Sequence, residues 1–217
     1  MYPGVIDIAR IAGKLKDEIG RGLPGTEVQL LMAPPDMHLM NFPKAPGVRT
    51  RAAAVLILLY IEHGILSTVF IQRPDYDGAH GGQIGFPGGM KEPSDQDLVA
   101  TAIREANEEI GIDISKINII GTLTPLFIPV SDILVTPVAG WTDNRPSYSL
   151  QKEEVVFQIE GRFQEFLNPS IVKIKQVMIR GEMRSIKYFD YDGHVIWGAT
   201  AMMLNELLEI IRRGRIL

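Results

Sequence analysis

A run of ten apolar residues, 52–61 (AAAVLILLYI), limits the fold of this 217-residue chain more than any other feature. A helix that crosses a bilayer needs roughly 20 apolar residues, so the run is too short and no membrane contact is expected. A short apolar run is typical of a strand buried in the centre of a sheet. We therefore expect a strand at residues 51–60, with its partner at residues 67–72 after a turn at residues 63–64.

The remaining elements mix helices and strands, which predicts an α/β fold with a sheet covered by helices on both faces. Apolar residues recur with helical spacing over residues 5–20, and Gly20 is expected to end that helix. Residues 21–48 are rich in Gly, Pro and Met, and we interpret them as an extended arm on the domain surface. Residues 1–48 would thus be a helix and arm packed on a main domain of residues 49–217. Further strands are expected near 117–124, 133–141, 172–179, 184–189 and 194–197, and helices near 162–167 and 199–213.

The composition excludes several classes of function. The chain has no cysteine, so disulfides, thiolate catalysis and zinc–thiolate sites are ruled out, and a cytoplasmic location is expected. The net charge of −4 and the pI of about 5.6 argue against a nucleic-acid partner, because such proteins usually carry a basic surface.

The segment most informative about function includes a predicted helix at residues 95–110, with Ser94 as its N-cap and Gly111 at its end. Its carboxylates Glu105, Glu108 and Glu109 fall along one edge of the apolar face. Like charges at this spacing repel one another, so helix stability gives no reason for the arrangement. Binding of a hard divalent cation such as Mg²⁺ or Mn²⁺ would explain the clustered carboxylates, because such a cation prefers oxygen ligands.

A glycine-rich loop precedes this helix and changes how its acids are interpreted. Alone, the helix would be an ordinary acidic surface helix with Arg104 paired to Glu108, and the loop a flexible turn. Together they are far more specific, because glycines allow close approach of the backbone to a ligand, and the carbonyl of Gly89 can join a metal site. The five glycines within nine residues are Gly81, Gly82, Gly85, Gly88 and Gly89.

These residues resemble the Nudix box, G-x(5)-E-x(7)-R-E-U-x-E-E-x-G-U, in which U is aliphatic. Gly89 matches the first glycine, and the second half matches without a gap from Arg104 to Ile112. The first half departs from the pattern, since Asp95 replaces the first glutamate and eight residues separate it from Arg104. In the family this acid pairs with the arginine and orients the helix.

A longer pattern is similar to the branch of the family thought to hydrolyse coenzyme A. Arg73, Gly82 and the FPGG sequence at residues 86–89 agree with it in type and spacing, whereas Gly78 replaces a second arginine. The WGAT sequence at residues 197–200 also looks like that branch, as do Glu154-Val155 and the FLNP sequence at residues 166–169, so the likeness covers roughly residues 50–212.

The resemblance implies an α/β/α sandwich with a mixed sheet that holds one to three Mg²⁺ or Mn²⁺ ions. The implied metal ligands are Glu105, Glu108, Glu109 and the Gly89 carbonyl, with Arg104 orienting them. Water would attack a phosphorus of a pyrophosphate, and either Glu108 or Glu154 would act as the base that activates this water. Coenzyme A would then yield 3',5'-ADP and 4'-phosphopantetheine.

Contacts to the nucleotide substrate are expected from Arg73, Gly82, Phe86, Arg51 and Lys91, although solvated surface or packing explains several of them equally well. We interpret Trp197 as a core residue rather than an adenine platform, and His80 as a loop residue.

Three other functions remain open. The box is shared by enzymes that act on ADP-ribose or dinucleoside pyrophosphates, and Gly78 favours such a substrate. A Nudix-fold binding protein without turnover would be expected to lose glutamates that this chain retains. A purely structural protein would have no reason to place acids beside its core.

The first helix and the arm could also form a homodimer interface.

Overall fold

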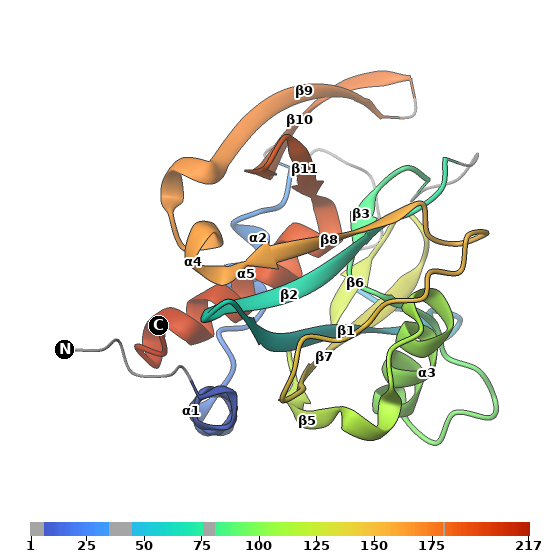
Figure 1. Ribbon diagram of the computed structural model, residues 1–217. Helices are drawn as coiled ribbons and strands as arrows, with labels where there is room; N and C mark the ends of the chain where they lie inside the picture. The colour runs from blue at the N-terminus through green and yellow to red at the C-terminus, as the bar shows by residue number, and fades with distance from the viewer. Residues whose placement is uncertain (1–6, 35–44, 76–80, 180) are drawn as a thin grey trace.

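The computed structural model of the chain describes residues 7–34, 45–75, 81–179 and 181–217 (Figure 1). At its centre is β1 (Arg51–Glu62), whose apolar side chains point alternately into two buried layers. β1 pairs in parallel with β7 (Ile133–Trp141) and antiparallel with β2 (Ile65–Gln72). The sheet is therefore mixed, and the long apolar run is its central strand, as the sequence predicts.

Shorter strands extend this sheet and place the glycine loop against it. Two lie inside the loop: β3 pairs with β2, and β4 pairs antiparallel with β1. β8 runs beside β2 along the opposite edge from β7, while β5 and β6 both pair with β7. Their bounds are β3 (Ile84–Gly85), β4 (Gly88–Met90), β5 (Asn118–Thr122), β6 (Leu126–Ile128) and β8 (Phe157–Arg162).

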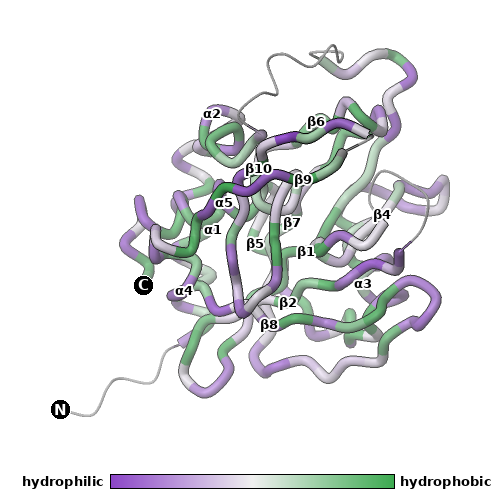
Figure 2. The backbone as a smooth tube through the Cα atoms, turned by 90° about the horizontal axis from the view of Figure 1, so that it is seen from above, coloured by the Kyte–Doolittle hydropathy of each residue, from purple (hydrophilic) through white to green (hydrophobic). Residues whose placement is uncertain are grey.

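Helices cover both faces of the large sheet, which confirms the expected sandwich. α3 (Leu98–Ile110) packs Ala102 and Ala106 against Leu56 and Leu58 of β1. On the other face, α5 (Gly198–Arg213) and α1 (Ile8–Arg21) enclose the larger core. Figure 2 shows the hydrophobic colouring that runs along β1 and β2 between these layers. A strand buried on both faces reads as a continuous apolar run, which explains the sequence of β1.

A second, three-stranded antiparallel sheet is built from β9 (Val172–Ile179), β10 (Glu182–Tyr191) and β11 (His194–Trp197). Its long β9–β10 hairpin arches away from the large sheet (Figure 1). The helix α4 (Phe163–Phe166) leads into it, and the ring of Phe166 packs on Phe189 and Tyr191 of β10. This aromatic contact fixes the base of the hairpin on the core.

The arm differs from its predicted extended form, because a short helix, α2 (Thr26–Leu30), interrupts it. Five residues are too few for a helix to be stable alone, so tertiary contacts must hold it. The fully buried carboxylate of Glu206 on α5 accepts hydrogen bonds from the backbone N–H of Gly25 and from Nε2 of Gln29. It also accepts hydrogen bonds from the N–H and hydroxyl of Thr124, so one side chain on α5 joins the arm to the segment between β5 and β6.

Two local predictions were wrong. The N-cap of α3 is Asp97 rather than Ser94, since Oδ1 of Asp97 accepts the Ala100 N–H at 2.8 Å. The strand β8 was missed because apolar and polar residues alternate over only the four residues FQIE before Gly161, a glycine that allows Phe70 and Phe166 to pack closely. Residues 35–44 of the arm, together with Gly78 and His80, lie outside the described residues. Within the described ranges, no helix has the length and apolarity needed to cross a membrane.

Candidate active site

The glycine loop meets the sheet at β4, where two glycines have different roles. Gly88 lies so close to β1 that a Cβ atom on it would be 2.3 Å from the Ala54 carbonyl oxygen, and its φ of 153° also favours glycine. Gly89 faces α3, and a Cβ atom there would lie 2.4 Å from Oε2 of Glu105. The backbone at Gly89 and the Glu105 carboxylate are thus in direct contact, as the proposed metal site requires.

Arg104 is the hub that holds the carboxylates of α3. Its Nη1 donates to Glu105 Oε1 and to Glu108 Oε2, both at 2.9 Å. Its Nη2 donates to the carbonyl oxygen of Met90 at 3.0 Å, which ties the helix to the end of β4. Because one planar guanidinium makes all these bonds, the positions of the acids relative to the loop are fixed together.

The pairing expected of the first acid forms in spite of the changed spacing. Asp95 accepts two hydrogen bonds from Arg104, from Nε at 2.9 Å and from Nη2 at 3.0 Å. Further bonds from the Glu92 N–H and the Thr101 hydroxyl complete its environment. The Arg104 guanidinium, together with these donors, holds the pKa of the Asp95 carboxyl well below its usual range. A turn from Glu92 to Asp95 accommodates the extra residue, so the shorter acid reaches the same partner.

Glu109 lies beneath the loop and is only 1% exposed. Its Oε2 accepts the Gly88 N–H at 2.7 Å, and its Oε1 pairs with Nη1 of Arg73 at 2.9 Å. Burial raises the pKa of the Glu109 carboxyl to about 7, although Arg73 and the Gly88 N–H oppose the shift. Arg73 also donates to the Gly88 carbonyl at 2.7 Å, so in this structure it braces the loop.

Glu154 belongs to a loop that is fastened to the end of α3. The Gln151 N–H donates to the Glu109 carbonyl oxygen, and the Val155 N–H donates back to Gln151. Burial raises the pKa of Glu105, and the negative charge of Glu154 adds to the shift at both Glu105 and Glu109. The structure therefore brings Glu154 into the electrostatic neighbourhood of the α3 acids.

The other predicted substrate contacts are more scattered. Arg51 is exposed at the start of β1 and donates to the Ser131 carbonyl, while Nζ of Lys91 donates to the Asp95 carbonyl. Phe86 is 1% exposed and packs on Phe70, so its role here is in the core. Gly82 adopts a φ of 67° in the turn before β3.

A pocket of about 220 Å³ opens beside the loop on the face opposite α3, and we call it the loop pocket. Phe86 and Arg73 line it together with Gly88 and Gly89 of β4. Gly89 therefore lies between this space and Glu105, so a ligand in the loop pocket can approach the acid cluster along β4.

The donor set fits a hard divalent cation in charge and in chemistry. Five carboxylates (Asp95, Glu105, Glu108, Glu109 and Glu154) surround only two guanidinium groups, those of Arg73 and Arg104. Across the part of the chain that the structure describes, no three acidic or histidine side chains lie together as a ready ligand group. The carboxylates of α3 are paired with Arg73 and Arg104. The surplus negative charge and the oxygen-only donors match what Mg²⁺ and Mn²⁺ require.

Comparison with known proteins decides the family, since the NUDIX domain family matches residues 50–191. The chain belongs to the Nudix family. It is 32% identical over 184 residues to an uncharacterized Nudix hydrolase, NudL, of Photorhabdus laumondii, covering 85% of this chain and 94% of that protein. NudL of Yersinia pestis is 33% identical over 183 residues, which cover 83% and 89%. The chain is thus a Nudix hydrolase of nucleoside diphosphate derivatives, and Nudix hydrolases generally use divalent metals.

A solved structure supports the fold. The Nudix hydrolase RenU of M. smegmatis superposes with a TM-score of 0.54 at 14% identity, covering 76% of this chain and 87% of that one.

In the Nudix fold of this chain, sequence patterns located the box but missed two of its supports, the Met90 carbonyl and the Thr101 hydroxyl. Thr101 had a detectable signal, because it lies one helical turn before Arg104 and Glu105.

Alanine at the two β4 glycines is expected to separate folding from activity. Gly89→Ala should leave the unfolding midpoint nearly unchanged, because only the flexible end of Glu105 must move, and should lower hydrolysis by about 10²-fold through misplacement of that carboxylate. Gly88→Ala should reduce the free energy of unfolding by about 2 kcal/mol or more, because its Cβ meets rigid β1 backbone. Thermal unfolding and turnover measured on both variants check this, and equal effects at the two positions would contradict it.

Proposed function

We propose that the chain hydrolyses the pyrophosphate bond of coenzyme A or an acyl-coenzyme A, in a reaction that depends on Mg²⁺ or Mn²⁺, to give 3',5'-ADP and a phosphopantetheine. The observation that carries the hydrolysis is the group of α3 carboxylates that Arg104 holds against Gly89. The coenzyme A substrate is supported by the branch pattern formed by Arg73, Gly82 and residues 86–89.

In this proposal, Glu105, Glu108, Glu109 and the Gly89 carbonyl hold the metal. A bound divalent ion supplies a more acidic water and neutralises charge that develops on the bridging oxygens. Asp95 and Arg104 set the positions of Glu105 and Glu108, and Arg73 steadies Glu109 and the loop. The water's proton passes to Glu108, which is about half exposed, or to Glu154, which is exposed on the neighbouring loop.

A second substrate class is ADP-ribose or another nucleoside diphosphate derivative. The glycine at position 78 favours it, because the coenzyme A branch normally offers an arginine there. A Nudix-fold binding protein without turnover is the remaining alternative, and the three retained glutamates of the box argue against it.

A substrate panel tests these proposals. The protein with Mg²⁺ or Mn²⁺ is incubated with coenzyme A, ADP-ribose, NADH and diadenosine polyphosphates, and the products are resolved by mass. We expect 3',5'-ADP and phosphopantetheine from coenzyme A, and a loss of about 10²–10⁴-fold in Glu108→Gln or Glu154→Gln, whichever removes the base. Cleavage of another substrate instead overturns the coenzyme A assignment, and no cleavage of any substrate favours the binding protein.

A further inference from the structure

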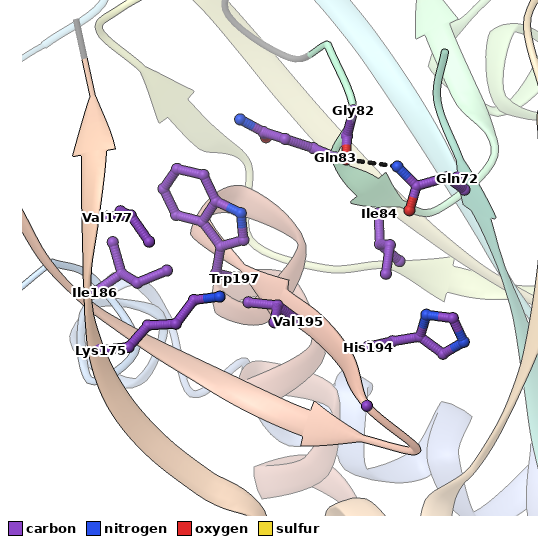
Figure 3. A pocket seen from close by; sticks show the side chains of 11 residues that line it. Gln72, Gly82, Gln83, Ile84, Lys175, Val177, Ile186, His194, Val195 and Trp197 are labelled. Carbon is purple, nitrogen blue, oxygen red and sulfur yellow. Dashed lines mark hydrogen bonds between the residues drawn. The ribbon is translucent and has the colours of Figure 1, made fainter. Parts of the chain in front are cut away.

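A second pocket, of about 290 Å³, lies between the three-stranded sheet and the segment that leads into the glycine loop (Figure 3). Lys175 of β9, Ile186 of β10 and Trp197 of β11 form one side of this distal pocket. Gln83 and Ile84 form the other side, and both also line the loop pocket. The two pockets are therefore neighbours across one short stretch of chain.

The distal pocket is a positively charged place in an acidic protein. Among the described residues that line the pocket, Lys175 is the only lysine or arginine, and none is an aspartate or a glutamate. Nζ of Lys175 lies 5.2 Å from the centre of the Tyr188 ring, and within the described ranges it forms no ion pair. By contrast, Lys173, two residues earlier on β9, is paired with Asp190. The charge of Lys175 is thus available to an anion.

Trp197 gives this pocket an aromatic surface. We expected a core residue, but the side chain is only half-buried, and Figure 3 shows its indole ring beside the pocket with the amine of Lys175 nearby. The amide of Gln83 lies across from it. An indole face stacks on planar rings, an amide forms hydrogen bonds with the edge of a base, and an ammonium group attracts phosphate.

We propose that the distal pocket binds the nucleoside end of the substrate and selects a nucleotide that carries a further phosphate in addition to its diphosphate. Trp197 contacts the base, and Lys175 pairs with the additional phosphate. A diphosphate that reaches Gly89 through the loop pocket leaves its nucleoside end beside Gln83 and Ile84. The carboxylates of α3 repel an additional phosphate group. A cation that binds this phosphate must therefore lie away from α3, and Lys175 does. The inference rests on the proposed function and names the part of the substrate that sets its specificity.

Fluorescence titration tests the pocket without turnover. The chain has two tryptophans, so the Trp141→Phe variant reports on Trp197 alone. In EDTA, 3',5'-ADP is expected to quench Trp197 emission and to bind about tenfold more tightly than 5'-AMP. Lys175→Gln in the same background should reduce this ratio to about twofold or less. The matched control is Lys173→Gln, which removes a lysine of the same strand whose charge is already paired, and should keep the ratio.

Three outcomes overturn the proposal: no change in Trp197 emission, no preference for 3',5'-ADP, or an equal preference in Lys175→Gln. Turnover separates this failure from failure of the proposed function. In one case coenzyme A is cleaved, but Lys175→Gln leaves the ratio of the KM for coenzyme A to the KM for 3'-dephospho-coenzyme A as it is in the wild type. The hydrolase assignment then stands and the distal pocket assignment is wrong. If nothing is cleaved but Lys175 still governs 3',5'-ADP binding, the pocket assignment stands and the hydrolytic proposal is wrong.

Discussion

Replacing Glu105 with glutamine is expected to lower kcat/KM by about 10³-fold, equivalent to about 4 kcal/mol of transition-state stabilisation. Glu105 contacts Gly89 and is held by Arg104, so its carboxylate is the acid most closely tied to the proposed metal site. Glutamine keeps the size of the side chain but removes the negative charge that a divalent ion needs. Initial rates and Mn²⁺ affinity, measured on the wild type and the variant, check the prediction.

Glu92→Gln is the matched control, because Glu92 lies 3.9 Å from the same guanidinium but is 57% exposed and outside α3. It should keep activity within about twofold, as expected of a surface ion pair. If the Glu105→Gln variant retains most of its activity and its affinity for Mn²⁺, the assignment of Glu105 as a metal ligand is wrong.

Glu206→Ala is expected to reduce the free energy of unfolding by about 3–5 kcal/mol and to lower the midpoint by about 10 °C. Glu206 is fully buried and accepts bonds from Gly25, Gln29 and Thr124. Truncation leaves those donors in the interior without their acceptor, and it also opens a cavity. Because the arm is fastened through this carboxylate, α2 should lose protection from hydrogen exchange before the large sheet does.

Glu209→Ala on the same helix provides the comparison, since Glu209 makes only surface pairs with Arg212 and Arg213. Its loss should cost no more than about 0.5 kcal/mol. If the two variants unfold at the same temperature, Glu206 does not fasten the arm.

Much of the fold follows from local patterns. The ten-residue apolar run became β1, and the helical periodicities became α1, α3 and α5, each within three residues of its predicted bounds. These elements are predictable because a helix or a strand buried on one or both faces must repeat its apolar residues with a fixed period. β8 shows its alternation over only four residues, and its position is decided by pairing with β2, over 80 residues earlier in the chain.

The acid cluster was equally visible, because Arg104, Glu105, Glu108 and Glu109 lie within two turns of one helix. Its supports were less so. The pairing of Asp95 depends on how the turn before α3 absorbs one extra residue, and Arg73 reaches Glu109 only because the loop folds back on β1.

The box, the central strand and the helix that carries the carboxylates were predictable, because each is encoded by residues close together in the chain. The fastening of the arm by Glu206, and the pocket that Lys175 and Trp197 share with Gln83, depend instead on how distant segments pack. These contacts join residues as many as 181 positions apart, and their partners are selected by packing and by the need to satisfy buried polar groups. Neither requirement leaves a periodic trace in the sequence.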